Sequence, residues 1–143
     1  MLRAVLDTNV LVSALLSRSG IPAQILARSG EYQLLVSDVL LDEVRDVLSR
    51  KRIRRKYPLS DDDVVRFVSL VRLAGEFVTL DPLRVENVIP SDPPDNLILA
   101  TAVQGRADVL VSGNVHLLQL DSHAGIRMVT PAAFLSALLS RLG

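Results

Sequence analysis

The chain has 143 residues, of which 49% are hydrophobic and 22% charged, a balance typical of one ordered globular domain. Its 16 basic and 16 acidic residues cancel, so any surface that attracts nucleic acid has to be local. The absence of cysteine excludes disulfides, thiolate catalysis and cysteine-based zinc sites, and it fits a cytoplasmic location. No apolar run approaches the ~20 residues of a membrane span, so neither a membrane segment nor a signal peptide is expected.

Strand-like and helix-like patterns alternate in the first half of the chain. Pro22 suits the first turn of a helix and Gly30 its end, while Ser37 and Ser60 are expected to cap two longer helices. In chain order the predicted elements are a strand at 2–7, helices at 8–17 and 19–30, a strand at 32–37, and helices at 38–56 and 60–75.

The alternation continues in the second half. The predicted elements are a strand at 76–80, a turn-rich connection at 81–95, a helix at 96–105, a strand at 107–113, a short helix at 114–120, a strand at 126–130 and a helix from Pro131 to Leu142. Strands separated by helices predict an α/β fold with a parallel sheet and helices on both faces. We expect one domain over residues 1–143, with a helical hairpin at about 38–75 projecting beside the sheet.

Polar residues stand where two of the predicted strands end. Asp7 follows the first strand, and Ser112, Gly113 and Asn114 follow a later one. Ligands of open parallel sheets bind outside the carboxyl ends of the strands, so this edge is the expected functional rim.

Two carboxylates in the first half of the chain are candidates for that rim. Asp7 can be a cap or turn residue, but its place at a strand end favours a functional role. Glu43 lies three residues after Leu40 and four before Val47, within the apolar stripe of its helix. The alternative for Glu43 is a boundary residue whose stem packs while its carboxylate reaches water.

Two more candidates come from the second half. Asp95 opens an apolar helix, and capping is the simpler explanation for it alone; Asp92 can fill a similar turn role before Pro93. Asn114 can likewise be a turn residue that caps the next helix. Considered together, however, acidic groups brought to one rim repel each other unless a cation bridges them. Oxygen ligands without cysteine favour Mg²⁺ or Mn²⁺, which orient water and neutralise a phosphodiester in metal-dependent nucleases.

Four segments in combination resemble the PIN domain family, in particular its bacterial branch related to the VapC-like toxins of toxin–antitoxin systems. They are VLDTNVLVSALL at 5–16, LLDEV at 40–44, DPPDNLILATAVQGRADVLVSGNVHLL at 92–118 and IRMVTPAAFL at 126–135. The resemblance covers essentially the whole chain. It implies a three-layer α/β/α sandwich with a central parallel sheet, and an endoribonuclease that depends on Mg²⁺ or Mn²⁺.

The same resemblance implies roles for single residues. Asp7 matches the first metal-binding aspartate, Glu43 the helix glutamate and Asp95 the aspartate that opens the later helix, with the ion on Asp7 and Asp95. Asn114 stands where many relatives have a fourth acid, and its uncharged amide oxygen would bind a cation more weakly. Thr8 and Asn9 can either orient Asp7 or a water on the metal, or only cap the first helix.

A basic segment is the candidate surface for RNA. The segment has the sequence SRKRIRRK at 49–56, and its basic residues are Arg50, Lys51, Arg52, Arg54, Arg55 and Lys56. Such a cluster in a neutral protein favours phosphate contacts over a merely solvated helix end. Aromatic residues make up only 3% of the chain, so we expect electrostatic contacts rather than base stacking.

Two alternatives and two partners complete the expectations. One alternative is that the chain has this fold but is a catalytically weak or inactive module that binds RNA or protein. Asn114 is the residue that best supports this alternative. An aspartyl-phosphate mechanism is disfavoured because Asn9 stands where a second acid is needed, and Lys51 and Lys56 are the only lysines. If the chain is a toxin, a small antitoxin should bind near the rim. The family resemblance also implies a homodimer, for which the helices at 38–75 offer apolar faces.

Overall fold

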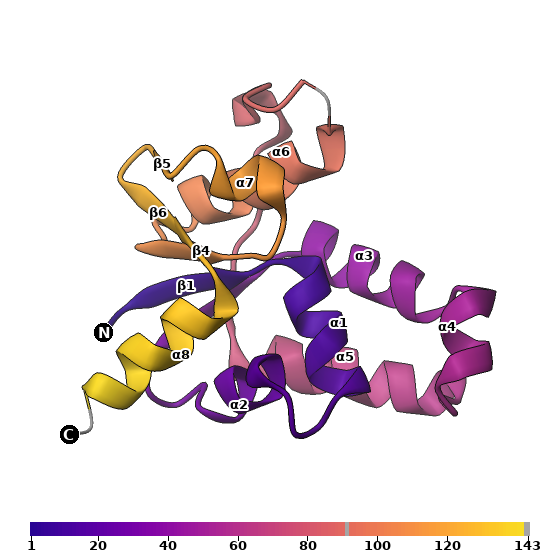
Figure 1. Cartoon of the computed structure of the whole chain (residues 1–143). Helices are drawn as coiled ribbons and strands as arrows, with labels where there is room; N and C mark the ends of the chain where they lie inside the picture. Colours follow the sequence, from indigo (N-terminus) through magenta and orange to yellow (C-terminus); the bar gives the residue numbers. More distant parts are fainter. Residues whose placement is uncertain (91, 142–143) are drawn as a thin grey trace.

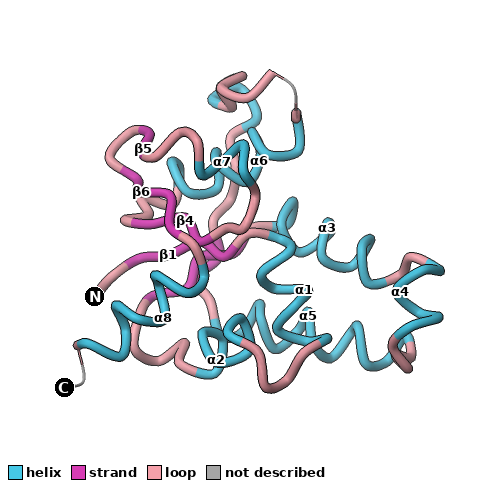
Figure 2. The backbone as a smooth tube through the Cα atoms, viewed as in Figure 1, coloured by secondary structure: helices cyan, strands magenta, loops and turns pink. Residues whose placement is uncertain are grey.

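A computed structural model describes residues 1–90 and 92–141 of the chain (Figures 1 and 2). The strands are β1 (Arg3–Leu6), β2 (Gln33–Val36), β3 (Glu76–Phe77), β4 (Val109–Val111), β5 (Ser122–His123) and β6 (Ile126–Val129). The helices are α1 (Thr8–Leu16), α2 (Ile21–Ala27), α3 (Asp38–Leu48), α4 (Lys51–Lys56), α5 (Asp61–Ala74), α6 (Pro93–Gln104), α7 (Val115–Leu118) and α8 (Pro131–Ser140), with one 3₁₀ turn at Pro82–Arg84.

The strands form one mostly parallel sheet, which confirms the predicted fold class. Their order across the sheet is β3-β2-β1-β4-β6-β5, and only the β5–β6 pair is antiparallel. In Figure 1, α6 and α7 lie on one side of the strands, and α2 and α8 lie on the other. Each parallel step needs a crossover, and the predicted helices provide these crossovers.

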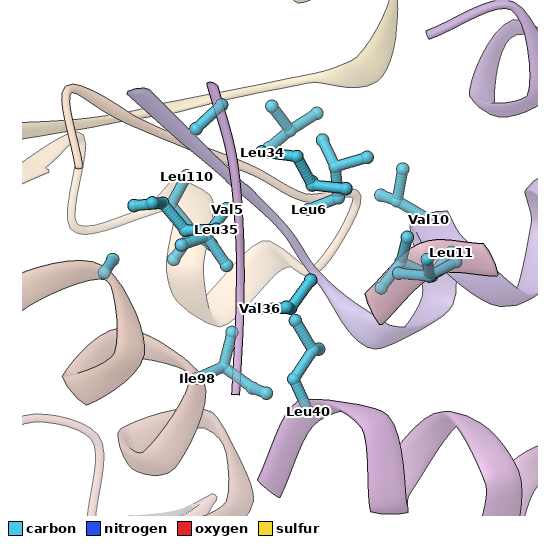
Figure 3. Packing of buried hydrophobic residues seen from close by; sticks show 14 of the residues in the cluster. Val5, Leu6, Val10, Leu11, Leu34, Leu35, Val36, Leu40, Ile98 and Leu110 are labelled. Atoms are coloured by element: carbon cyan, nitrogen blue, oxygen red, sulfur yellow. The ribbon is translucent and has the colours of Figure 1, made fainter. Parts of the chain in front are cut away.

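The central strands are buried because helices cover both faces of the sheet. Val5, Leu6, Leu34 and Leu35 are fully buried, and Leu110 on the neighbouring strand is equally inaccessible. Figure 3 shows these side chains packed with residues of α1, α3 and α6 in one cluster. This accounts for the nearly continuous apolar runs of the strands, which are typical of a parallel sheet.

The long helix predicted at 38–56 is in fact two helices. α3 ends at Leu48, and α4 begins at Lys51 after Arg50, whose backbone is extended. Arg54 stabilises the break, because its Nε donates to the carbonyl of Leu48 (2.7 Å) and its Nη1 to that of Leu59 (3.2 Å). The break lets Ile53 pack against the core instead of extending into water with the surrounding cations. The α3–α5 segment therefore carries a short third helix at its tip (Figure 1).

One other element differs from the sequence-based expectation. β5 was not predicted; it is only two residues long, and the chain enters and leaves it through Asp121 and Ala124, which both have positive φ. On α5, Leu70 and Leu73 do not pack in the core but are 65% and 83% exposed. Leu142, the predicted end of the last helix, and Ser91 in the connection lie outside the described residues.

Among the described residues, no single helix has the length and apolar character needed to cross a membrane; only α1 and α2 taken together, bent by 97°, meet those criteria.

Pairing of the strands fixes the rim of the sheet. Leu6 is in register with Val111, and the next backbone N–H, that of Asp7, donates to the carbonyl of Val111 at 2.9 Å. On the neighbouring strand, Val36 leads into Ser37, which caps α3. The Ser37 hydroxyl also lies 2.9 Å from that of Thr101 on α6, and this buried contact ties together the two helices that carry Glu43 and Asp95.

Candidate functional site

Asp7 lies at the carboxyl end of β1 with only 5% of its surface exposed. Its Oδ1 accepts the backbone N–H of Thr8 (2.8 Å), which caps α1, and its Oδ2 accepts the hydroxyl of Ser112 (2.7 Å). Burial raises the pKa of Asp7, the two hydrogen bonds lower it, and the charge of Asp92 raises it further. The net effect is a raised pKa, so the ionised form is stabilised less than it would be in water.

Asp95 comes from the first turn of α6 and is 7% exposed. Burial, followed by the charges of Asp92 and Asp7, raises its pKa to about 6. A contact with the Asp92 carboxyl also raises the pKa, whereas a hydrogen bond from Asn114 Nδ2 to Asp95 Oδ2 (2.8 Å) lowers it. Asp7 therefore acts on the ionisation of Asp95 although 88 residues separate them in the chain.

Glu43 lies half-buried on α3, between the buried positions Leu40 and Val44. Burial raises its pKa most, and the charges of Asp7 and Asp92 raise it as well. The Thr8 hydroxyl, close to the Glu43 carboxylate, lowers the pKa of Glu43. Thr8 Oγ1 nevertheless makes no hydrogen bond to any described residue. Thr8 thus offers a buried oxygen without a partner beside the acidic side chains.

Asp92 joins the acidic residues from the turn before α6. It is the N-cap residue of that helix, but its side chain makes no capping hydrogen bond within the described chain. Its charge raises the pKa of Asp7, Glu43 and Asp95 alike. The sequence suggested for Asp92 a turn role or a substitute for the acid that position 114 lacks, but nothing local indicates that the 81–95 connection brings it back to the rim.

The other polar residues predicted near the rim contribute less. Asn9 is exposed on α1, and no hydrogen bond of its side chain is found among the described residues. His116 is exposed, and its backbone N–H donates to Asn114 Oδ1 (2.9 Å). Away from the rim, Ser60 and Asp63 form a capping box at the start of α5, which confirms the cap expected at Ser60.

Three side chains hold the site together; the sequence placed Ser112 at the rim without a partner and indicated no role in the site for Thr101 or Asn96. Ser112 is fully buried and bonds to Asp7, and Thr101 bonds to Ser37. Asn96 accepts the backbone N–H groups of Val88 (2.9 Å) and Ile89 (2.7 Å), and so anchors the loop that leads to Asp92. A buried polar residue inside an apolar segment is a usable signal for such roles, but its partners are distant in sequence.

The basic segment lies away from this rim. Figure 1 places α4 at the far tip of the α3–α5 hairpin. Arg50 forms an ion pair with Asp46 (3.3 Å). Arg54 is hydrogen-bonded at the break between α3 and α4 and forms an ion pair with Asp61 (3.1 Å). The remaining cations of the segment are exposed: Lys51, Arg52, Arg55 and Lys56.

The donor chemistry at the rim fits a hard, hydrated cation. In residues 1–90 and 92–141, no three acidic or histidine side chains converge closely enough to form a metal cage. Mg²⁺ commonly needs only one or two carboxylates, with water and substrate phosphates completing its octahedron. Asp7 and Asp95, with raised pKa values and the unpartnered Thr8 hydroxyl nearby, match that requirement.

Comparisons with known proteins agree with the fold described above. The family model described as "PIN domain" matches residues 3–116. A search of curated protein sequences gave no match. Among solved structures, the chain is similar to DNA-bound VapBC from Salmonella typhimurium (18% identity, TM-score 0.65, 92% of this chain and 99% of that chain covered). It is also similar to VapBC2 from Rickettsia felis bound to a promoter DNA fragment (13% identity, TM-score 0.65, 90% and 98% covered).

Proposed function

Because the chain belongs to the PIN domain family, we propose that it is a Mg²⁺- or Mn²⁺-dependent endoribonuclease and the toxin of a toxin–antitoxin pair. One observation carries the proposal: the charge of Asp7 raises the pKa of both Glu43 and Asp95, which come from different helices. Acidic side chains gathered in this way destabilise the protein unless a cation or protons compensate them. A function that requires the cation explains why the protein tolerates this loss of stability.

Each residue has a defined part in this proposal. Asp7 and Asp95 hold the ion, and an ion bound there supplies charge neutralisation for the scissile phosphate and orients the attacking water. Glu43, with its raised pKa, accepts a proton from that water more readily than an exposed glutamate does. The Thr8 hydroxyl lowers the pKa of Glu43 and so favours the ionised form of that carboxylate.

The direct test compares RNA cleavage by the wild type and by Asp7→Asn in the presence of Mn²⁺. We expect the substitution to reduce cleavage by more than the roughly 10- to 100-fold that follows loss of a residue supporting a metal ligand. Asp42→Asn is the matched control, because Asp42 is exposed on α3 next to Glu43 and should be dispensable. Equal cleavage by the wild type and Asp7→Asn would refute the nuclease proposal.

The exposed cations of α4 are proposed to contact RNA phosphates. Lys51, Arg52, Arg55 and Lys56 carry four positive charges at one end of the molecule, whose net charge is zero. α3 carries Glu43 and connects the α4 end of the molecule with the sheet (Figure 1), so an RNA strand held at α4 can extend along α3 to the acidic residues. Arg54 is a weaker candidate because its guanidinium is already hydrogen-bonded within the protein.

An antitoxin is the proposed protein partner. Both similar structures are VapBC complexes, in which a VapC-type chain is accompanied by its VapB partner. We propose that a small protein of this kind covers the rim formed by Asp7, Asp95 and Glu43. Expression of the chain alone should arrest growth, and co-expression of the product of a neighbouring gene should relieve the arrest; harmless expression of an active enzyme would contradict a toxin role.

We also propose that the chain forms a homodimer through α5. Leu70 and Leu73 are exposed there, and Leu70 borders an open apolar groove that Ala14, Leu26 and Phe67 also line. Sedimentation of the wild type and of Leu73→Glu tests this, with the variant expected to be monomeric. A monomeric wild type would exclude the dimer.

The alternative is an inactive PIN-fold module that binds RNA or protein. It is favoured by one observation, the orientation of Asn114, whose amide nitrogen faces Asp95 where relatives often place a carboxylate. The cleavage assay distinguishes the two proposals, because only the inactive module predicts that RNA binds without being cut.

A further inference from the structure

The side-chain amide of Asn114 has a single orientation that satisfies both of its neighbours. The backbone N–H of His116 can only donate, so it faces Oδ1 (2.9 Å). An ionised Asp95 can only accept, so its Oδ2 faces Nδ2 (2.8 Å). The opposite orientation would place donor against donor and acceptor against acceptor. Asn114 Oδ1 therefore accepts a hydrogen bond at the start of α7, and Asn114 Nδ2 faces the rim, where it donates to Asp95.

Ser112 extends this arrangement to Asp7. Its hydroxyl has one proton, which it donates to Asp7 Oδ2 (2.7 Å), and it accepts the backbone N–H of Asn114 (2.9 Å). Ser112 is fully buried, and its own backbone N–H donates to the carbonyl of Val129 (2.9 Å), which fixes it to β6. A continuous set of hydrogen bonds thus runs from Asp7 through one turn to Asp95.

We propose that the Ser112–Gly113–Asn114 turn is a positioning bridge between the two carboxylates, in which Asn114 acts as a donor to Asp95 and not as a ligand of the ion. The bridge attracts both carboxylates to one rigid turn, whereas an acid at position 114 would repel Asp95. It therefore preserves the arrangement of Asp7 and Asp95 before any ion binds. The effect of the bridge on ion binding rests on the proposed function, whereas the bridge in the metal-free protein does not.

Two substitutions at position 114 separate the donor from the helix cap. Asn114→Ser keeps an oxygen that can accept the His116 N–H but removes the amide donor, and Asn114→Asp keeps the acceptor but puts a carboxylate against Asp95. Gln119→Ser is the control, because Gln119 is an exposed amide at the other end of α7. Circular dichroism checks that all variants retain the fold.

The first measurement uses metal-free protein. We expect Asn114→Asp to have a lower Tm than Asn114→Ser, because it adds repulsion to the loss of the donor. Ser112→Ala and Asn114→Ser should lower the Tm by less together than the sum of their separate effects, since they disrupt one connected set of bonds. Additive shifts, or equal Tm values for the two substitutions at position 114, would overturn the bridge.

The second measurement is calorimetric titration with Mn²⁺. Asn114→Ser should weaken Mn²⁺ binding by roughly 10- to 100-fold, as loss of a residue that orients a metal ligand does, while Gln119→Ser binds like the wild type. Unchanged affinity in Asn114→Ser would overturn the positioning role. If the wild type binds no Mn²⁺, the proposed function fails, and the metal-free experiment still decides whether the bridge exists.

Discussion

The acidic rim and the basic tip of the α3–α5 hairpin are both charged, but they are built in opposite ways. At the rim, Asp7 and Asp95 are almost fully buried, and each is hydrogen-bonded to a residue distant in sequence. At the tip, Arg52 and Arg55 are exposed on a helix of six residues. The rim is organised by tertiary structure, whereas the tip is a local feature of the sequence.

This difference has an energetic consequence. A buried carboxylate has to be compensated by hydrogen bonds, protons or a cation, so its position is tightly specified. An exposed cation is solvated, and its contribution to folding is small and screened by salt. Substitutions at the rim should therefore affect chemistry and stability together, while substitutions of the exposed cations at the tip should affect only the binding of RNA.

The largest expected effect after Asp7→Asn is that of Glu43→Gln. The substitution keeps the shape of the side chain but removes its charge and its ability to take a proton, so RNA cleavage with Mn²⁺ should fall by roughly 100-fold or more. Because burial raises the pKa of Glu43, the metal-free protein should at the same time become more stable. Cleavage rate and metal-free Tm are the two measurements, and a normal rate with an unchanged Tm would place Glu43 outside the site.

Arg54 gives the sharpest contrast within the basic segment. Arg54→Ala removes the bonds to the carbonyls of Leu48 and Leu59 and should lower the free energy of unfolding by about 1–3 kcal/mol. Arg55→Ala is the control, since an exposed residue without such bonds should change stability by less than about 0.5 kcal/mol. Urea unfolding measures both, and equal losses would mean that the break between α3 and α4 does not depend on Arg54.

The acidic rim also predicts how stability depends on pH. The pKa of Asp95 is about 6 in the folded protein, above its ordinary value near 4, so the folded state binds the proton more tightly than the unfolded state. Stability of the metal-free protein should therefore fall as pH rises from about 4 through 6. Thermal unfolding in EDTA across this range measures it, and Asp95→Asn should flatten the curve. Asp63 and Glu76, whose pKa values are lowered, act in the opposite direction in both proteins, so an Asp95→Asn curve parallel to that of the wild type would contradict the raised pKa of Asp95.

The smallest effect is expected from the tip. Arg52→Ala combined with Arg55→Ala should weaken RNA binding by a few-fold and reduce the slope of log K against log salt by roughly 1 for each phosphate that the variant no longer neutralises. The cleavage rate at saturating RNA should not change, because neither residue touches the rim. A salt dependence identical to that of the wild type would show that RNA does not contact α4.

Local patterns in the sequence were sufficient for most of the fold. Alternating apolar runs predicted the strands of the sheet except β5, and the caps at Ser37 and Ser60 were correct. The prediction of one long helix at 38–56 was wrong. The break at Arg50 depends on Arg54, which bonds to two carbonyls, and on Ile53, which packs against the core. The apolar pattern of the helix at 60–75 did not decide which of its positions are covered, since periodicity shows that a helix is apolar but not whether a neighbour packs on each side chain; Leu70 and Leu73 are exposed.

The sequence by itself determined which residues had to be compensated: Asp7 at a strand end, Glu43 in an apolar stripe and Asp95 before a buried helix. Only the tertiary structure decided what compensates Asp7 and Asp95, namely the hydroxyl of Ser112 and the amide of Asn114, and that the charge of Asp92 adds to their repulsion. The physical reason is that burial can be read from local apolar context, whereas a hydrogen bond or a charge interaction depends on distances between atoms. Those distances are set by the register of β1 with β4 and by the contact between α3 and α6.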